Sequence, residues 1–346
     1  MKIEKSDFSW AVSRGLIEEA QADQLWEALR DHKKSHAKFD FVHVSYYFGA
    51  LLVIGAMGWF MGSAWEAFGG GGIFLISLIY AGFFLYFGNR MWLRQDLKIP
   101  GGLLISMSVC MTPLAVYGLQ RWLNVWAFDD PGEYRDFHNW IRGGWFAMEV
   151  ATVAMGLLAL RYYKFSFLTA PVACALWYIS MDLTPIIADG EDYAWSLRSA
   201  VSMWFGLVMI IVAYIIDVRI KQDFCFWVYL FGTLTFWGGM TAGPWFADAE
   251  IYKFFGFLIN IVLILLSVFL RRRVFMVFGA IGVFTYISYL AYQVFENSDL
   301  FPFVLTAFGL GLIYTGIKLQ QSAKKLNIWF DNNIPTKLKT LRPPER

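Results

Sequence analysis

The chain has 346 residues, of which 58% are hydrophobic and 16% are charged, and its mean hydropathy is +0.49. This composition is typical of integral membrane proteins rather than of soluble domains. The formal net charge of +2 is small, and no basic stretch is interleaved with aromatic residues in a soluble region, so nucleic acid is not expected as a partner. The apolar runs are continuous rather than alternating, which predicts an all-α bundle of transmembrane helices.

The first 42 residues are polar and are predicted to form a helical leader in the cytoplasm. The pattern favours two short helices, residues 7–14, ended by Gly15, and residues 18–36. This leader is too small to hold a core alone, so its apolar side is expected to lie on the membrane surface or on cytoplasmic loops. His32 and His36 are spaced i, i+4, but the lysines around them favour a solvated face over a metal site.

The first strongly apolar run begins the membrane region and has no charge from Val44 to Trp65. It is long enough to cross about 30 Å of hydrocarbon as a helix. Small residues on two of its faces are expected to pack against two neighbouring helices. They are Ser45, Gly49, Ala56 and Ser63 on one face, and Gly55, Gly58 and Gly62 on the other.

Ten transmembrane helices are predicted, and together they form a bundle over residues 43–320. Their ranges are 43–64, 72–93, 101–121, 143–161, 165–183, 198–217, 224–243, 252–270, 274–294 and 300–319. Lysine and arginine gather in alternate connections and in the basic tail at 321–346, so the positive-inside rule predicts that both termini are cytoplasmic. The opposite connections are acidic, either as an ordinary result of topology or as a means of attracting cations.

Two outer connections have unusual compositions. Residues 121–142 are both aromatic and acidic around the turn Asp130-Pro131-Gly132, which predicts interfacial pieces that form a lid over the outer face. The glycine run Gly69–Gly72 has no following lysine or hydroxyl residue to make a phosphate-binding loop, and it is interpreted as a flexible turn.

Two segments of the sequence resemble a known family. The leader segment Gly15–Ala22 (GLIEEAQA) and the segment Phe48–Gly55 (FGALLVIG), which leads a multi-span region, are similar to the bacterial membrane proteins grouped as domain of unknown function 2157. The resemblance implies a multi-pass protein of the bacterial inner (cytoplasmic) membrane. It implies no activity.

Glu149 is the strongest candidate functional residue, because a charge near the bilayer centre costs about 3 kcal/mol or more. It is expected about 10 Å below the outer end of the fourth span. The short connection Arg161–Lys164 predicts an antiparallel hairpin that brings Asp182 to the same side. Thr184-Pro185 is expected to break the fifth span, and Thr112-Pro113 to bend the third.

These residues favour a polar cavity that opens outward, in which Glu149, Asp182 and Asn260 bind a proton or an ion. Other polar residues expected in the outer half of the membrane are Gln120 and Gln293. An alternative stays open for Glu149. It would then pair with Arg142 or Arg198, or be neutral and hydrogen bonded as a packing device.

No active-site motif is present in the sequence, and the three cysteines, Cys110, Cys174 and Cys225, show no paired spacing. We therefore expect no metal site and no cofactor, and a non-enzymatic role is favoured over a lipid-active enzyme. Two functions stay open. One is a carrier or channel for a small solute or ion; the other is a non-transporting scaffold, sensor or assembly factor whose first helix and leader bind a membrane or cytoplasmic protein.

Overall fold

A computed structural model describes residues 8, 11–34, 44–46, 48–49, 51–53, 55–56, 65–126, 145–188, 195–220, 222–243, 250–295, 303, 306–307, 309–311 and 314. All regular structure in this part of the chain is helical, so the predicted all-α class is confirmed there. The chain divides into two units, Met1–Leu51 and Leu52–Arg346.

The leader contains helix α2, Glu19–Lys34, close to the predicted range. The turn before it is made by Gly15, whose φ of +68° is a left-handed conformation that favours glycine. The Gly15 and Leu16 amides donate to the carbonyls of Val12 and Ala11, which ends the preceding helical segment as the sequence predicts. The ring of Trp26 lies 5.9 Å from that of Phe8, so the apolar side of α2 is partly covered within the leader itself.

The second unit contains a series of long apolar helices. Their bounds are α4 Trp65–Arg94, α5 Lys98–Cys110, α6 Thr112–Leu123, α7 Phe146–Tyr162, η2 Ser166–Leu168, α8 Thr169–Ala188, α9 Trp195–Arg219, α10 Phe226–Ala242, α11 Glu250–Leu270 and α12 Arg273–Phe295. These helices coincide with the second to ninth predicted spans. Within the described residues, six segments are long and apolar enough to cross a membrane. The α7 and α10 helices are shorter, with 17 residues each.

The predicted first and tenth spans lie largely outside the described residues. The positions that are described in both segments are helical. The total of ten spans and the cytoplasmic location of both termini therefore stay predictions.

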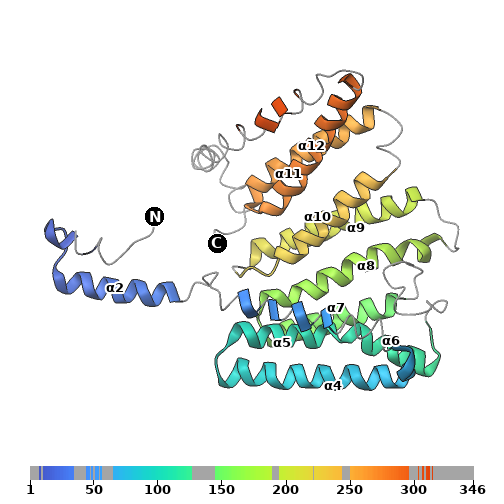
Figure 1. Ribbon diagram of the computed structural model, residues 1–346, viewed down its shortest axis with the longest axis horizontal. Coiled ribbons are helices and arrows are strands. Elements are labelled where there is room, and N and C mark those ends of the chain that lie inside the picture. The colour runs from blue at the N-terminus through green and yellow to red at the C-terminus, as the bar shows by residue number, and fades with distance from the viewer. Residues whose placement is uncertain are drawn as a thin grey trace. The chain divides into compact units, whose positions relative to one another are not determined.

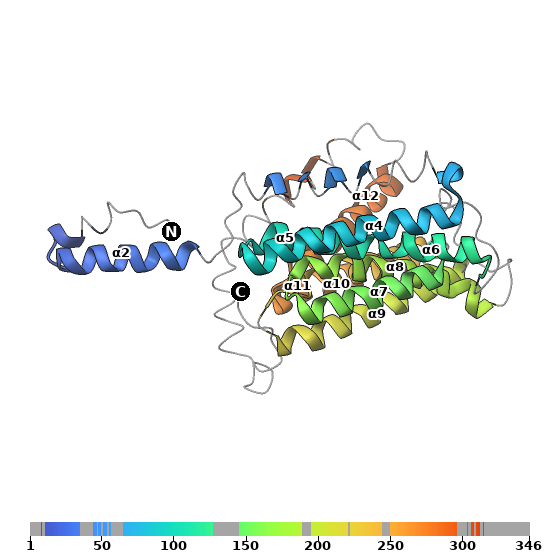
Figure 2. The same ribbon diagram turned by 90° about the horizontal axis from the view of Figure 1, so that it is seen from below.

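The helices of this unit form consecutive antiparallel hairpins (Figures 1 and 2). Helix α4 packs along α5 and α6, α7 along α8, α9 along α10, and α11 along α12. Neighbouring hairpins meet where α7 contacts α5 and α6, where α8 contacts α9 and α10, and where α10 contacts α12. The predicted α7–α8 hairpin is confirmed, and the hydroxyl of Thr169, the first residue of α8, donates to the Ser166 carbonyl of η2 at 2.7 Å.

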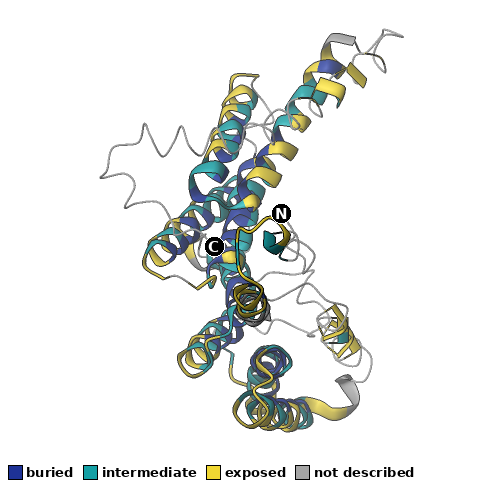
Figure 3. Ribbon diagram, turned by 90° about the vertical axis from the view of Figure 1, so that its left-hand side faces the viewer, coloured by how far each residue is buried: buried dark blue, intermediate teal, exposed yellow. Residues whose placement is uncertain are grey.

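Glycines lie where the backbones of paired helices meet. A Cβ atom on Gly239 of α10 would lie 2.5 Å from the Met203 amide nitrogen of α9, and one on Gly279 of α12 would lie 2.6 Å from the Asn260 carbonyl oxygen of α11. Small residues permit this close approach in membranes, where packing rather than the hydrophobic effect holds helices together. Buried and exposed residues accordingly alternate along the helices (Figure 3).

Two predictions about helix breaks are wrong. The glycine run is not a flexible turn: only Gly69 has a positive φ, and Gly70–Gly72 begin the regular part of α4. A Cβ on Gly70 would lie 2.4 Å from the Trp122 amide nitrogen, so this glycine lets α4 and α6 touch. Helix α8 continues through Pro185 to Ala188, because a proline in the last turn removes only one backbone hydrogen bond. At Thr112-Pro113, where a bend is predicted, α5 ends at Cys110 and α6 starts at Thr112, while Met111 between them keeps right-handed helical angles (φ −78°, ψ −13°).

Candidate functional site

Glu149 lies in the first turn of α7, with 3% of its surface exposed. The predicted span starts at residue 143, whereas α7 starts at Phe146, so Glu149 is nearer the N-terminal end of its helix than expected. Neither carboxylate oxygen has a hydrogen-bond partner among the described residues. Glu149 is thus a deeply buried acidic side chain with no pairing cation in that part of the chain.

Helix α8 presents three ionisable side chains towards Glu149. Cys174, Tyr178 and Asp182 are spaced i, i+4 and i+8, so they form one stripe along this helix. Glu149 interacts electrostatically with each of them. Asp182 is 1% exposed, so two buried carboxyl groups lie close together, as the predicted hairpin requires.

The close approach of α7 and α8 depends on Gly156. A Cβ at this position would lie 2.3 Å from the Val172 Cγ2 atom, so no larger residue fits without a shift. Gly156 thus admits a neighbouring helix at the face of Glu149. Thr152 on the same face is buried, and its hydroxyl donates to the Met148 carbonyl at 2.7 Å.

The site extends to the break between α5 and α6. Cys110, the last residue of α5, interacts electrostatically with Cys174. Pro113 in the first turn of α6 lacks an amide hydrogen, which explains why the helix is interrupted at Met111. The thiols of α5 and α8 thereby join the carboxyl groups of α7 and α8 in one cluster. We call Cys110, Glu149, Cys174, Tyr178 and Asp182 the α7–α8 acidic cluster.

Aromatic side chains pack together at the N-terminal end of α7, beside this cluster. Trp145, one turn before Glu149, stacks on Tyr117 of α6 with ring centroids 5.7 Å apart and planes 22° apart. The Tyr117 ring also lies 5.8 Å from that of Trp126. Arg121 donates to the Tyr117 hydroxyl at 2.7 Å. The predicted lid at residues 121–142 lies mostly outside the described residues, but its first part is aromatic and contacts the helices beside Glu149.

Asn260, the third predicted ion-binding residue, lies in a different group of helices. Its amide oxygen accepts from the Trp237 indole of α10 at 3.0 Å, and its amide nitrogen donates to the Gly256 carbonyl at 2.8 Å. A Cβ on Gly282 of α12 would lie 2.1 Å from its side chain. Asn260 therefore joins α10, α11 and α12, and the structure does not bring it together with Glu149 and Asp182.

The alternative partners of Glu149 are only partly described. Arg142 lies outside the described residues, and Arg198 lies over the ring of Trp195 at 5.8 Å. Of the other polar residues expected in the outer half, Gln120 has a buried amide oxygen without a partner in the described chain, and Gln293 is exposed.

The small residues of the first apolar run are also only partly described. Ser45, Gly55 and Ala56 are exposed and Gly49 is half-buried. A Cβ on Gly49 or Gly55 would meet no described atom within 4 Å. Gly58, Gly62 and Ser63 lie outside the described residues. A packing role for both faces of this helix stays a prediction.

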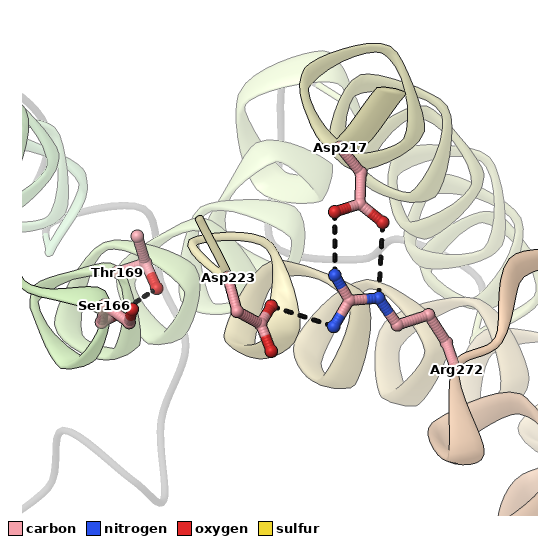
Figure 4. A network of polar contacts seen from close by, with 5 residues as sticks. All are labelled: Ser166, Thr169, Asp217, Asp223 and Arg272. Atoms are coloured by element: carbon pink, nitrogen blue, oxygen red, sulfur yellow. Dashed lines mark hydrogen bonds and ion pairs between the residues drawn. The ribbon is translucent and has the colours of Figure 1, made fainter. Parts of the chain in front are cut away.

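Sequence reasoning missed a buried charge network that joins two hairpins (Figure 4). Arg272, between α11 and α12, donates from Nη2 to Asp217 Oδ1 at 2.7 Å and from Nε to Oδ2 at 3.2 Å. Its Nη1 donates to Asp223 Oδ1 at 2.8 Å, and its guanidinium lies 5.4 Å from the Tyr229 ring centre. Burial by itself would lower the pKa of Arg272, but the hydrogen bonds and negative charges of both aspartates raise it.

A signal for this network is present in the sequence. Arg271–Arg273 fits the positive-inside pattern, and sequence reasoning assigned it no other role. Asp217, however, lies in the last turns of a predicted span, and its side chain has no exposed surface in the structure. A carboxylate at such a position needs a cationic partner, which directs attention to the arginines of a neighbouring connection.

Metal-ligating side chains do not gather in the described residues: no three His, Cys, Asp or Glu side chains there are placed to hold one metal ion. His36 and the side chain of His32 lie outside that part of the chain. Cys110, Cys174 and Cys225, all in the described part of the chain, form no disulfide.

Comparison with known proteins finds a similar family but indicates no activity. Residues 9–120 match the model of the family described as predicted membrane protein (DUF2157). The match covers the leader and the helices up to α6, including Cys110, and it ends before Glu149 and Asp182. Neither the curated proteins nor the solved structures contain a significant match to the chain. Over residues 9–120, the chain is therefore similar to the predicted membrane proteins of the DUF2157 family.

Proposed function

We propose that this multi-pass membrane protein moves a proton or a small cation across the bilayer by means of the buried carboxyl groups of Glu149 and Asp182. The observation that carries the proposal is the environment of Glu149, whose two oxygens are buried with no partner in the described chain. Ionisable groups inside membranes are costly, and they mark ion and proton pathways in many membrane proteins.

The second carboxyl group strengthens this proposal. Two like charges that share a site of low dielectric cannot both ionise unless a cation neutralises them. The pair formed by Glu149 and Asp182 is therefore suited to bind and release a proton or a cation. A structural role for Glu149 would instead call for donors to its oxygens.

The proposed setting is the inner membrane of a bacterium, with ten spans and both termini in the cytoplasm. The alternate placement of lysine and arginine in the connections supports this orientation. In it, α7 runs from outside to inside, so Glu149 and Asp182 lie in the outer half of the membrane.

The test compares ion flux through the wild-type protein and Glu149→Gln in sealed liposomes. Gln keeps the size of the side chain and removes its charge and its exchangeable proton. Glu250→Gln is the matched control, because Glu250 is an exposed carboxylate that pairs with Lys253 at the start of α11. We expect flux of protons or monovalent cations in the wild type and in the control, and its loss in Glu149→Gln. Equal flux in all three proteins, or none in the wild type, would exclude the proposal.

A second candidate function is a non-transporting scaffold, sensor or assembly factor. The small residues of the first apolar run favour it, because a glycine such as Gly49, where a Cβ would meet no described atom within 4 Å, permits close approach of a partner helix. On this alternative, Glu149→Gln leaves the physiological role intact, whereas Gly49→Leu, which adds a bulky side chain there, abolishes it. Opposite effects of the two substitutions distinguish the functions.

A further inference from the structure

The side chains around Glu149 are groups that carry protons. Helix α8 contributes the thiol of Cys174, the phenol of Tyr178 and the carboxyl group of Asp182, each in electrostatic contact with Glu149. Helix α5 adds the thiol of Cys110 beside Cys174. No lysine or arginine side chain of α5 or α8 lies between these groups.

Among the described residues, the other elements that pack against α7 add no competing ion. On α6, Arg121 is held by the Tyr117 hydroxyl at 2.7 Å and lies at the exposed end of the helix. The short η2 helix, Ser166–Leu168, has no ionisable side chain. On α7 itself, Arg161 is exposed in the last turn.

The cluster combines thiols with carboxyl groups, which is not the ligand set that a hard metal cation prefers. Such ions bind several oxygen atoms at once, whereas thiols prefer soft metals. The hydroxyl of Thr152, on the face of Glu149, is directed to the Met148 carbonyl. A proton requires only one acceptor oxygen, and Glu149 has two with no donor in the described chain.

We infer that the ion handled by the α7–α8 acidic cluster is a proton, held between Glu149 and Asp182, with Tyr178, one turn from Asp182 on α8, as the positioning residue. The inference rests on the proposed function, which leaves the ion open. In the exchange step, the carboxylic acid of Asp182 gives its proton to the Glu149 carboxylate. Asp182 then carries the negative charge, Glu149 becomes neutral, and the pair keeps a net charge of −1 throughout.

The spacing along α8 supports the role of Tyr178. Residues four apart lie one above the other on the same helical face, so Tyr178 stands between Cys174 and Asp182 in the stripe. A phenol both donates and accepts a hydrogen bond, so it can orient an acid and its carboxylate without being ionised. Removing its hydroxyl should slow proton exchange and leave the choice of ion unchanged.

The first experiment measures proton entry into liposomes that contain the full-length protein and a pH-sensitive dye, driven by a potassium diffusion potential. We expect the same rate in sodium chloride and in choline chloride. Asp182→Asn and Glu149→Gln should lower the rate by about a hundredfold, the scale of a lost proton-transfer group. Tyr178→Phe should lower it severalfold, and Tyr162→Phe, an exposed tyrosine on α7, should not change it.

A second measurement uses the wild-type protein, so it does not depend on the folding of a variant. A hydrophobic carbodiimide adds to protonated carboxyl groups in apolar surroundings. We expect it to modify Glu149 or Asp182 and to stop proton entry. Sodium chloride should not protect the site when compared with choline chloride, and raising the pH should protect it.

Each outcome decides between the two proposals. Sodium or potassium flux that depends on Glu149 without proton entry, or protection by sodium but not by high pH, overturns the proton inference and leaves the proposed transport function standing. No flux of any ion in the wild type overturns both.

Discussion

At the scale of one residue, the free-energy cost of burying Glu149 indicates that this side chain serves a function. Its place in the first turn of α7 is favourable, since the positive end of the helix dipole stabilises a carboxylate by about 0.5–1 kcal/mol. Burying an acidic group in the membrane costs about 3 kcal/mol or more. The dipole does not offset this cost, and neither oxygen has a donor in the described chain. Such violations of ordinary packing rules are expected at functional sites.

Replacing Glu149 with Met should therefore leave the protein equally stable or make it more stable. Met has a similar volume and removes the buried charge, and such replacements are often neutral or stabilising. Thermal unfolding in detergent would measure the change. A fall of several degrees in the midpoint would indicate instead that Glu149 has a stabilising partner in the part of the chain that is not described.

Asp217→Asn should destabilise the protein by about 3 kcal/mol, because it leaves the buried Arg272 guanidinium without its bidentate counter-charge. Asp223→Asn is the matched control. The Asp223 side chain is 46% exposed and accepts one hydrogen bond from Arg272, so its loss should cost less than about 1 kcal/mol. Unfolding midpoints of the two variants give the comparison, and equal losses would contradict this account of the network.

At the scale of the element, contact glycines determine how closely the helices of each hairpin approach. Gly206 and Gly239 do this between α9 and α10, where a Cβ on Gly206 would lie 2.3 Å from the Phe236 amide nitrogen. Both contacts are with backbone atoms, which cannot rotate away. The glycines of these helices are therefore packing devices rather than sources of flexibility, and this includes Gly70, which sequence reasoning took for part of a loop.

Gly239→Ala should destabilise the α9–α10 hairpin by about 2 kcal/mol, the usual cost of overpacking. Gly238→Ala provides a neighbouring control with the same change, because a Cβ at that position meets no described atom within 4 Å. It should alter stability by less than about 0.5 kcal/mol. Denaturation of both variants in the same detergent tests the difference, which should vanish if α9 and α10 are not in close contact.

At the scale of the whole molecule, two separate sets of polar contacts join the hairpins. The Arg272 network joins the α9–α10 hairpin to the connection between α11 and α12, and the Trp237–Asn260 hydrogen bond joins α10 to α11 at another level. The α7–α8 acidic cluster lies away from these polar contacts, where α7 and α8 meet α5. Substitutions in the polar contacts should thus lower the stability of the fold, while those in the cluster should change the rate of ion movement.

The orientation in the membrane is testable with reporter fusions. The charge pattern predicts that residue 221 lies in the cytoplasm and residue 247 outside. A green fluorescent protein fused after residue 221 should fluoresce, and alkaline phosphatase fused after residue 247 should be active. A fusion after residue 346 should behave as the one at 221. If the fusion at 221 does not fluoresce and the fusion at 247 is inactive, the topology is inverted. Glu149 and Asp182 would then lie in the inner half of the membrane.

The membrane character, the all-α class and the ranges of eight helices follow from the sequence alone. Hydropathy and charge act locally: an apolar run must satisfy its backbone inside the bilayer, which makes it a helix. The short connection Arg161–Lys164 similarly predicts that Glu149 and Asp182 are neighbours, since few residues leave the two helices no other arrangement.

Only the tertiary structure decided which faces of the helices meet. It placed Cys174 and Tyr178 towards Glu149, assigned Asn260 to a contact with Trp237, and joined Arg272 to Asp217 across 55 positions of sequence. In lipid an apolar side chain is equally soluble on every face of a helix, so hydropathy does not distinguish a contact face from a lipid face. That choice depends on shape, on glycines and on polar partners distant in sequence.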